Sequence, residues 1–165
     1  AGTFLIKDIY PGRTDSLVAE ITEWNGKAYF FANDGTHGTE FWVTDGTAAG
    51  ARLVKDIRPG VQGSDVRWLR IVGGKLVFAA NDGVHGRELW TSDGTAAGTV
   101  MLKDIAPGTS GSNPGRIQLN GDICYFIAWT AATGFELWTS DGTAGGTRLV
   151  KDIRPGSVGR RGNGS

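Results

Sequence analysis

"GRELWTSDGTAAGTVMLKDIAPG", residues 86–108, is the stretch that decides the fold, because much of it appears twice more in the chain. Its tryptophan repeats at Trp42, Trp90 and Trp138, each 48 residues after the last. Lys-Asp-Ile, followed by one variable residue and Pro-Gly, keeps the same period. A fixed period of this length indicates stacked structural units, each unable to bury its apolar surface alone. Copies of Lys-Asp-Ile begin at Lys7, Lys55, Lys103 and Lys151.

Each unit reads as four short strands without a helix. The runs "AYFFA" from Ala28, "LVFAA" from Leu76 and "ICYFI" from Ile123 are apolar on both alternating faces, which predicts a strand covered on both sides. "NDGVHG", residues 81–86, is a turn signal that joins such a strand to "RELWTS" as a hairpin. Further strands are expected in 17–24 and its equivalent 65–72, and in 100–105, where the proline after Lys-Asp-Ile ends the strand.

Four antiparallel strands in about 48 residues are typical of a propeller blade. We therefore predict an all-β fold, a β-propeller-type repeat of four-stranded antiparallel blades. A β-solenoid usually has shorter rungs, and an ordinary sandwich has no reason to keep a strict period. The expected segment 1–155 contains a lone strand at 2–9 and units at about 11–57, 58–105 and 106–153. Residues 156–165 are expected to form a flexible tail.

Composition narrows the classes of partner. The 17 basic residues balance 17 acidic ones, so no net field attracts nucleic acid or an anionic membrane. No apolar run is long enough to span a membrane as a helix. The 27 glycines point to many turns, and the single Cys124 cannot form an internal disulfide, which leaves both redox compartments open.

Three stretches carry a resemblance to a known family. Residues 39–60, 86–115 and 135–156 contain "EFWVTDGT", "ELWTSDGT" and "ELWTSDGT" and resemble the ELWxxDGT repeats of bacterial, mostly secreted or surface-associated, multi-repeat proteins. The resemblance implies a propeller-like β architecture and an extracellular or cell-surface location, with no established reaction. The first copy departs from it at Phe41 and Ala51, and the third replaces Asn-Asp-Gly with Trp129-Thr130-Ala131.

Most repeated residues are read as structural. An aspartate before Gly-Thr, at Asp45, Asp93 and Asp141, is expected to staple a turn, since one aspartate per turn is too few for a calcium loop. The repeated tryptophans are expected to plug the space between blades, although exposed tryptophans could instead stack on sugars. Better candidates for exposure lie outside the register, at Trp24, Trp68 and Trp129. Each repeated lysine and the aspartate beside it point to opposite faces, so the lysines are expected to form ion pairs across to another blade rather than with their own neighbour.

The exposed hairpin tips "NDGxHG" hold the candidate ligand-binding residues. They could hydrogen-bond a glycan or another chain. Two histidines on separate blades are too few for a zinc site, so no metal and no cofactor is predicted. The candidates are Asn33, Asp34, His37, Asn81, Asp82 and His85.

Catalysis finds little support in the sequence. Nucleophile-elbow, phosphate-loop and His-Glu-x-x-His motifs do not occur, and Cys124 lies in an apolar strand. Glu40, Glu88 and Glu136 could in principle hydrolyse glycosides, but they recur in every unit, whereas active sites break symmetry. We predict no enzyme and no catalytic residue.

Three blades cannot close a ring, since propellers use about four to eight. The ring would be completed by the rest of a longer chain or by a second copy, giving a homodimer of six blades in which a terminal strand fastens the neighbour. The predicted function is a secreted structural or adhesion scaffold for protein contacts and self-assembly. The alternative is a multivalent carbohydrate-binding propeller.

Overall fold

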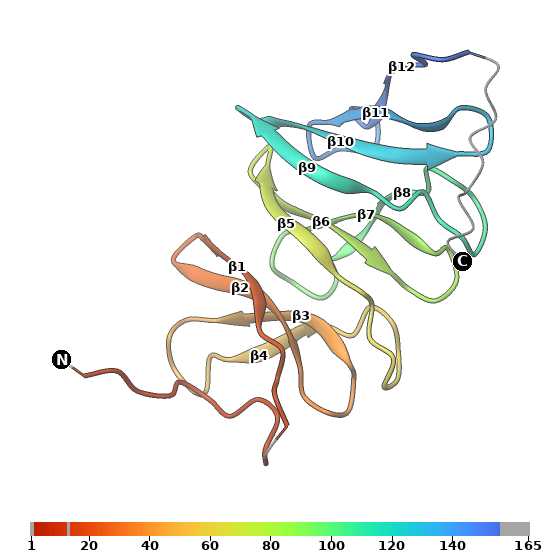
Figure 1. Ribbon diagram of the computed structural model, residues 1–165. Helices are drawn as coiled ribbons and strands as arrows, with labels where there is room; N and C mark the ends of the chain where they lie inside the picture. Colours follow the sequence, from red (N-terminus) through yellow and green to blue (C-terminus); the bar gives the residue numbers. More distant parts are fainter. Residues whose placement is uncertain (1, 13, 156–165) are drawn as a thin grey trace.

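The computed structural model describes residues 2–12 and 14–155, and the predicted flexible tail 156–165 lies outside them. Every strand in this part of the chain belongs to one of three antiparallel four-stranded sheets, one per repeat unit (Figure 1). These residues contain no helix, and hence none that could cross a membrane. The all-β prediction and the four-strand unit are confirmed.

In each sheet the strands follow one another in chain order. Sheet 1 contains β1 (Ala19–Trp24), β2 (Lys27–Asn33), β3 (Thr39–Thr44) and β4 (Arg52–Lys55). Sheet 2 contains β5 (Arg67–Val72), β6 (Lys75–Asn81), β7 (Arg87–Ser92) and β8 (Val100–Lys103). Sheet 3 contains β9 (Gly115–Asn120), β10 (Ile123–Thr130), β11 (Gly134–Ser140) and β12 (Arg148–Lys151).

The sheets pack face to face, with aromatic side chains between sheets 1 and 2. Phe78 of β6 lies 5.8 Å from Phe31 and 4.9 Å from Phe41, measured between ring centroids. On its other face sheet 2 buries Val77 and Leu89 against sheet 3. Residues 76–80 are completely buried, so the prediction that this strand is covered on both sides is confirmed.

The repeated tryptophans lie in these layers. Trp42, Trp90 and Trp138 are at most 9% exposed. Trp90 and Trp138 lie in the cores between two sheets, which confirms the predicted plug between units, whereas Trp42 packs beside Ile9 on the open face of sheet 1. Trp24 and Trp68 are half-buried and pack against the edges of the two inter-sheet cores. Trp129 is also half-buried, so the three tryptophans outside the register are indeed the more accessible ones.

In sheets 1 and 2, a buried glutamate ties the sheet to the chain that enters the next one. The Glu40 carboxylate accepts hydrogen bonds from the Ile57 N–H at 3.0 Å, the Arg58 N–H at 3.2 Å and the Ser64 hydroxyl at 2.8 Å. Burial raises the pKa of Glu40 to about 7 despite these bonds, which lower it. Glu88 repeats the arrangement with the Ile105, Ala106 and Ser112 donors, and burial raises its pKa too.

Lysines link successive sheets, but the predicted ion pairs are wrong. Lys55 Nζ donates to the Thr99 carbonyl at 2.9 Å, and Lys103 Nζ donates to the Thr147 carbonyl at 2.6 Å. Both lysines therefore cross to the next sheet, as expected, and bond a backbone oxygen of its last connection. The adjacent aspartates cannot replace these oxygens, because neighbouring strand residues point to opposite sides.

The sheets form an open fan. β1 lies against β5 and β5 against β9, so the first strands adjoin along one side of the molecule (Figure 1). Sheet 2 lies between sheet 1 and sheet 3, so in the described part of the chain each outer sheet keeps one face without a neighbouring sheet. The segment predicted as a lone strand, residues 2–9, lies beside the open face of sheet 1 and has no ladder partner among these residues.

Candidate functional site

The predicted ligand-binding residues are engaged with one another at the hairpin tips of sheets 1 and 2. The Asp34 carboxylate accepts the backbone N–H groups of Thr36 and His37 at 2.9 Å, and its other oxygen lies 2.8 Å from His37 Nδ1. Asn33 accepts the Gly35 N–H at 2.7 Å. The structure thus places each set of three in one self-bonded turn.

The second tip repeats the first. Asp82 accepts the N–H of His85 at 2.8 Å and lies 2.7 Å from its Nδ1, while Asn81 bonds the Gly83 N–H. The hydrogen bond to Asp82 raises the pKa of His85. Sheet 3 has a Thr130–Thr133 hydroxyl pair at this position, as its sequence departs from the pattern. The six candidates therefore form two separate turns and do not converge on one site.

The Asp-Gly-Thr connections are also satisfied internally. Asp93 Oδ1 accepts the Thr95 N–H at 2.9 Å and its hydroxyl at 2.6 Å. Asp45 and Asp141 make the same bonds, which confirms the predicted turn staple. Within residues 2–12 and 14–155, His, Cys, Asp and Glu side chains nowhere gather in threes as metal ligands. Burial raises the pKa of the Cys124 thiol to about 11.

The open face of sheet 1, called here the leading face, presents apolar side chains to solvent. Ile21 is 68% exposed, whereas its equivalents Leu69 and Ile117, 48 residues apart, are completely buried against the preceding sheet. Val18 is likewise 48% exposed where Val66 is buried. An open apolar groove of about 370 Å³ lies along this face. Its lining includes Phe4, Leu5, Ile6, Val18, Ile21 and Phe30.

Residues 2–9 bind the leading face in the manner of a fourth strand. Lys7 Nζ donates to the Ala51 carbonyl at 2.7 Å, which repeats the bond from Lys55 to Thr99. Ile9 packs against the core that contains Phe30 and Trp42. Its equivalent Ile57 packs in the same way beside Phe78 and Trp90. The segment therefore occupies the place of the last strand of a sheet that would precede sheet 1.

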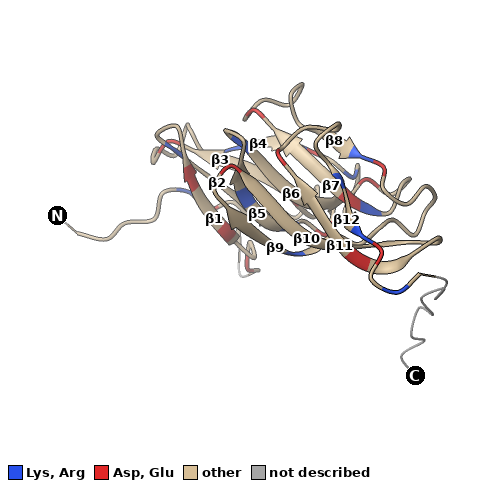
Figure 2. Cartoon of the chain, turned by 90° about the horizontal axis from the view of Figure 1, so that it is seen from above, with Lys and Arg blue, Asp and Glu red and all other residues tan. Residues whose placement is uncertain are grey.

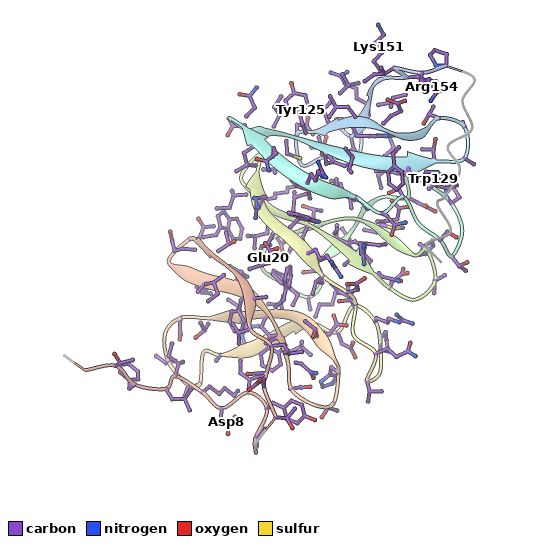
Figure 3. The ribbon with its side chains drawn as sticks, viewed as in Figure 1. Asp8, Glu20, Tyr125, Trp129, Lys151 and Arg154 are labelled. Carbon is purple, nitrogen blue, oxygen red and sulfur yellow. The ribbon has the colours of Figure 1, made fainter. Side chains whose placement is uncertain are left out.

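The open face of sheet 3, called the trailing face, also leaves apolar side chains accessible. Leu137 is 36% exposed, although its equivalents Leu89 and Phe41 are completely buried against the following sheet. Tyr125 and Ile127 are half-buried on the same face of β10. Figure 3 shows Tyr125 and Lys151 at this end of the molecule and Asp8 at the opposite end.

Charge does not distinguish either face. Figure 2 shows basic and acidic residues interspersed over the three sheets, without a region of one sign. The net charge is zero. Contacts at the two open faces would therefore depend on apolar burial and backbone hydrogen bonds rather than on electrostatic attraction.

A bulge in each first strand escaped the sequence analysis. Glu20, Trp68 and Arg116 have positive φ angles of 56°, 65° and 55°, at the same position of each unit. The Glu20 carboxylate accepts the Trp68 N–H at 3.2 Å and lies 3.4 Å from Arg70, which joins β1 to β5. Because the residue types differ, the sequence carries no signal for this conformation, which is unusual outside glycine.

Comparisons with known proteins give the fold and no function. No protein-family model matches the chain, and no curated protein matches it. A solved structure from an analysis of two prolyl endopeptidases aligns with a TM-score of 0.53 at 18% sequence identity. The alignment covers 79% of this chain and 19% of that one, so the chain spans about a fifth of that protein's length. At this identity the likeness concerns the fold alone.

Proposed function

We propose that this chain is a non-catalytic scaffold module whose sheets are blades of a propeller, and that two copies associate head to tail through their open faces. One observation carries the proposal. Lys7 and Ile9 contact sheet 1 as Lys55 and Ile57 contact sheet 2, so residues 2–9 lie on the leading face where the last strand of a preceding sheet would lie.

The two open faces are the separated halves of an interface that occurs twice inside the chain. Tyr125 and Leu137 of the trailing face stand at the repeat positions of Tyr29 and Phe41, which pack against sheet 2. Ile21 and Phe30 stand at the positions that sheet 2 uses to receive them. Joining sheet 3 of one copy to sheet 1 of another therefore buries side chains similar to those between sheets 1 and 2, in the same arrangement.

Closure gives a reason for two copies. Six sheets fall within the range of about four to eight blades that close a ring. A head-to-tail contact uses different surfaces on the two partners, and it ends in a ring only if the rotation closes. Closing it covers both apolar faces, which a single copy leaves open to water.

Sedimentation of the wild-type chain and a matched pair of variants tests this proposal. Ile21→Glu places a carboxylate in the proposed interface, and we expect it to weaken association at least about 100-fold, since a buried unpaired charge is costly. Val84→Glu changes an apolar residue of similar exposure at a hairpin tip and should leave association unchanged. A wild-type chain that stays monomeric at every concentration would overturn the proposal and favour further repeats of a longer chain as the occupant.

The extracellular or cell-surface setting belongs to the same proposal and is supported by the repeat resemblance. Fractionation of producing cells tests it. The carbohydrate-binding alternative would need the hairpin tips, whose side chains bond one another. A glycan array with Asp34→Ala and Asp82→Ala decides this alternative, because only a lectin would show binding that both changes abolish.

A further inference from the structure

Head-to-tail association brings two segments, residues 4–7 of one copy and β12 of the other, to the same edge of β11. Residues 4–7 of one copy lie where the fourth strand of the preceding sheet belongs, and in the partner copy β12 already fills that place beside β11. Only one of them can pair with this edge of β11. One segment must leave when the leading and trailing faces meet.

β12 is the least buried of the three strands that come last in their sheets, β4, β8 and β12. Val54 of β4 and Leu102 of β8 are at most 9% exposed, because the next sheet covers them. Their counterpart in β12, Val150, is 44% exposed. The ladder that holds β12 pairs Arg148 with Thr139, Leu149 with Trp138 and Lys151 with Leu137, with an irregularity in the register.

The competing segment has nearly the same sequence and is more apolar. Residues 2–12 and 146–156 differ only at Phe4 against Arg148, Ile6 against Val150 and Tyr10 against Arg154. Phe4 is 76% exposed and Ile6 is 39% exposed, so both have apolar surface left to bury. Pairing with β11 would remove part of this apolar surface from water. Arg148 and Val150 of β12 have less apolar surface to bury in the same place.

We infer that the interface forms by strand exchange, in which residues 4–7 of one copy replace β12 as the fourth strand of sheet 3 in the other. This inference rests on the proposed function. The repeat register sets Phe4 opposite Thr139 and Leu5 opposite Trp138 of the partner copy. Lys7 and Ile9 keep their contacts with their own sheet 1, so one segment connects the two copies.

Hydrogen exchange followed by mass spectrometry across the concentration range of association tests the exchange. The backbone amides of 4–7 should gain at least about tenfold protection in the associated form, while those of 148–151 lose protection to a similar degree. Association with the opposite pattern, protection at 148–151 and none at 4–7, would overturn the exchange and leave the proposed function standing. Absence of association would overturn both.

Two variants exchange the side chains that we expect to make residues 4–7 the preferred partner of β11. Phe4→Arg with Ile6→Val gives the first segment the residues of β12, and we expect protection of 148–151 to persist on association. Arg148→Phe with Val150→Ile should have the same effect from the other side. If residues 148–151 lost protection in both variants as they do in the wild type, the greater apolar surface of residues 4–7 would not be the cause of the exchange. All four side chains lie on exposed segments, so both variants should fold.

Discussion

At the residue scale, the buried glutamates couple stability to pH. Glu40 has its pKa raised from 4.5 to about 7 by burial. A carboxyl group that binds its proton more tightly in the folded state stabilises the fold fully below the unfolded pKa, near 4.5. That contribution is lost as the pH rises through about 7.

We therefore expect the contribution of Glu40 to lower the free energy of unfolding by on the order of 3 kcal/mol between about pH 4.5 and pH 8. Urea unfolding across this range measures it. Glu40→Gln should flatten the dependence, and Glu23→Gln, at an exposed position, should not. An unchanged slope in Glu40→Gln would refute the assignment.

The two histidines offer a second test within one chain. Asp82 raises the pKa of His85 through their hydrogen bond, and Asp34 does the same for His37. Asp82→Asn should lower the pKa of His85 toward its usual value and leave that of His37 in place. NMR titration of the imidazole resonances follows both at once, and a parallel shift of both histidines would count against the paired-turn explanation.

Residue roles were predictable where the partner lies in the same turn. The staple of Asp93 follows from Asp-Gly-Thr alone, because its acceptors and donors are two residues apart. The lysine partner was missed because Lys55 bonds a carbonyl 44 residues away, and backbone oxygens carry no sequence label. The recurrence of Glu40 in every unit argued against a catalytic role, but its hydrogen-bond donors in the next connection became evident only in the fold.

At the element scale, the hairpin tips touch the chain entering the next sheet. Gly86 has φ +70°, and a Cβ there would collide with the backbone of Gly111. Gly74 has a similar φ of +74° in the β5–β6 turn, with no atom within 4 Å of a Cβ. The two glycines thus share backbone strain and differ in the space around them.

Alanine substitution separates these effects. Gly74→Ala should cost about 1 kcal/mol from the left-handed backbone alone. Gly86→Ala should cost at least about 2 kcal/mol more, because the hairpin must move away from the next connection. Urea midpoints measure both, and equal losses would show that the close approach of the two loops does not contribute to stability.

The strands were predictable from their apolar runs and the turn signals between them, and their irregularities were not. Runs that are apolar on both faces, such as 76–80, indicated strands between two layers. The positive φ at Glu20 and Trp68 left no pattern, since neither residue type favours it. Residues 2–9 have the sequence of a strand, but a ladder needs a partner, and the described chain supplies none.

At the scale of the whole molecule, the three sheets are held together by two apolar cores, one between each pair of neighbouring sheets. The outer faces of sheets 1 and 3 have the side chains for further cores of the same kind. Ile21 at one end and Leu137 at the other are exposed where their repeat equivalents are buried. The repeat itself predicted that each unit needs a neighbour. Which neighbour it takes could not be read from the sequence, because a second copy and a further repeat present the same residues.

The mass in solution, measured by light scattering over a wide concentration range, tests the central claim most directly. Head-to-tail closure predicts a limiting mass of about 35 kDa, twice the 17.4 kDa of the chain, with no larger species. A mass of 17.4 kDa at every concentration, or a series of ever longer assemblies, would contradict it.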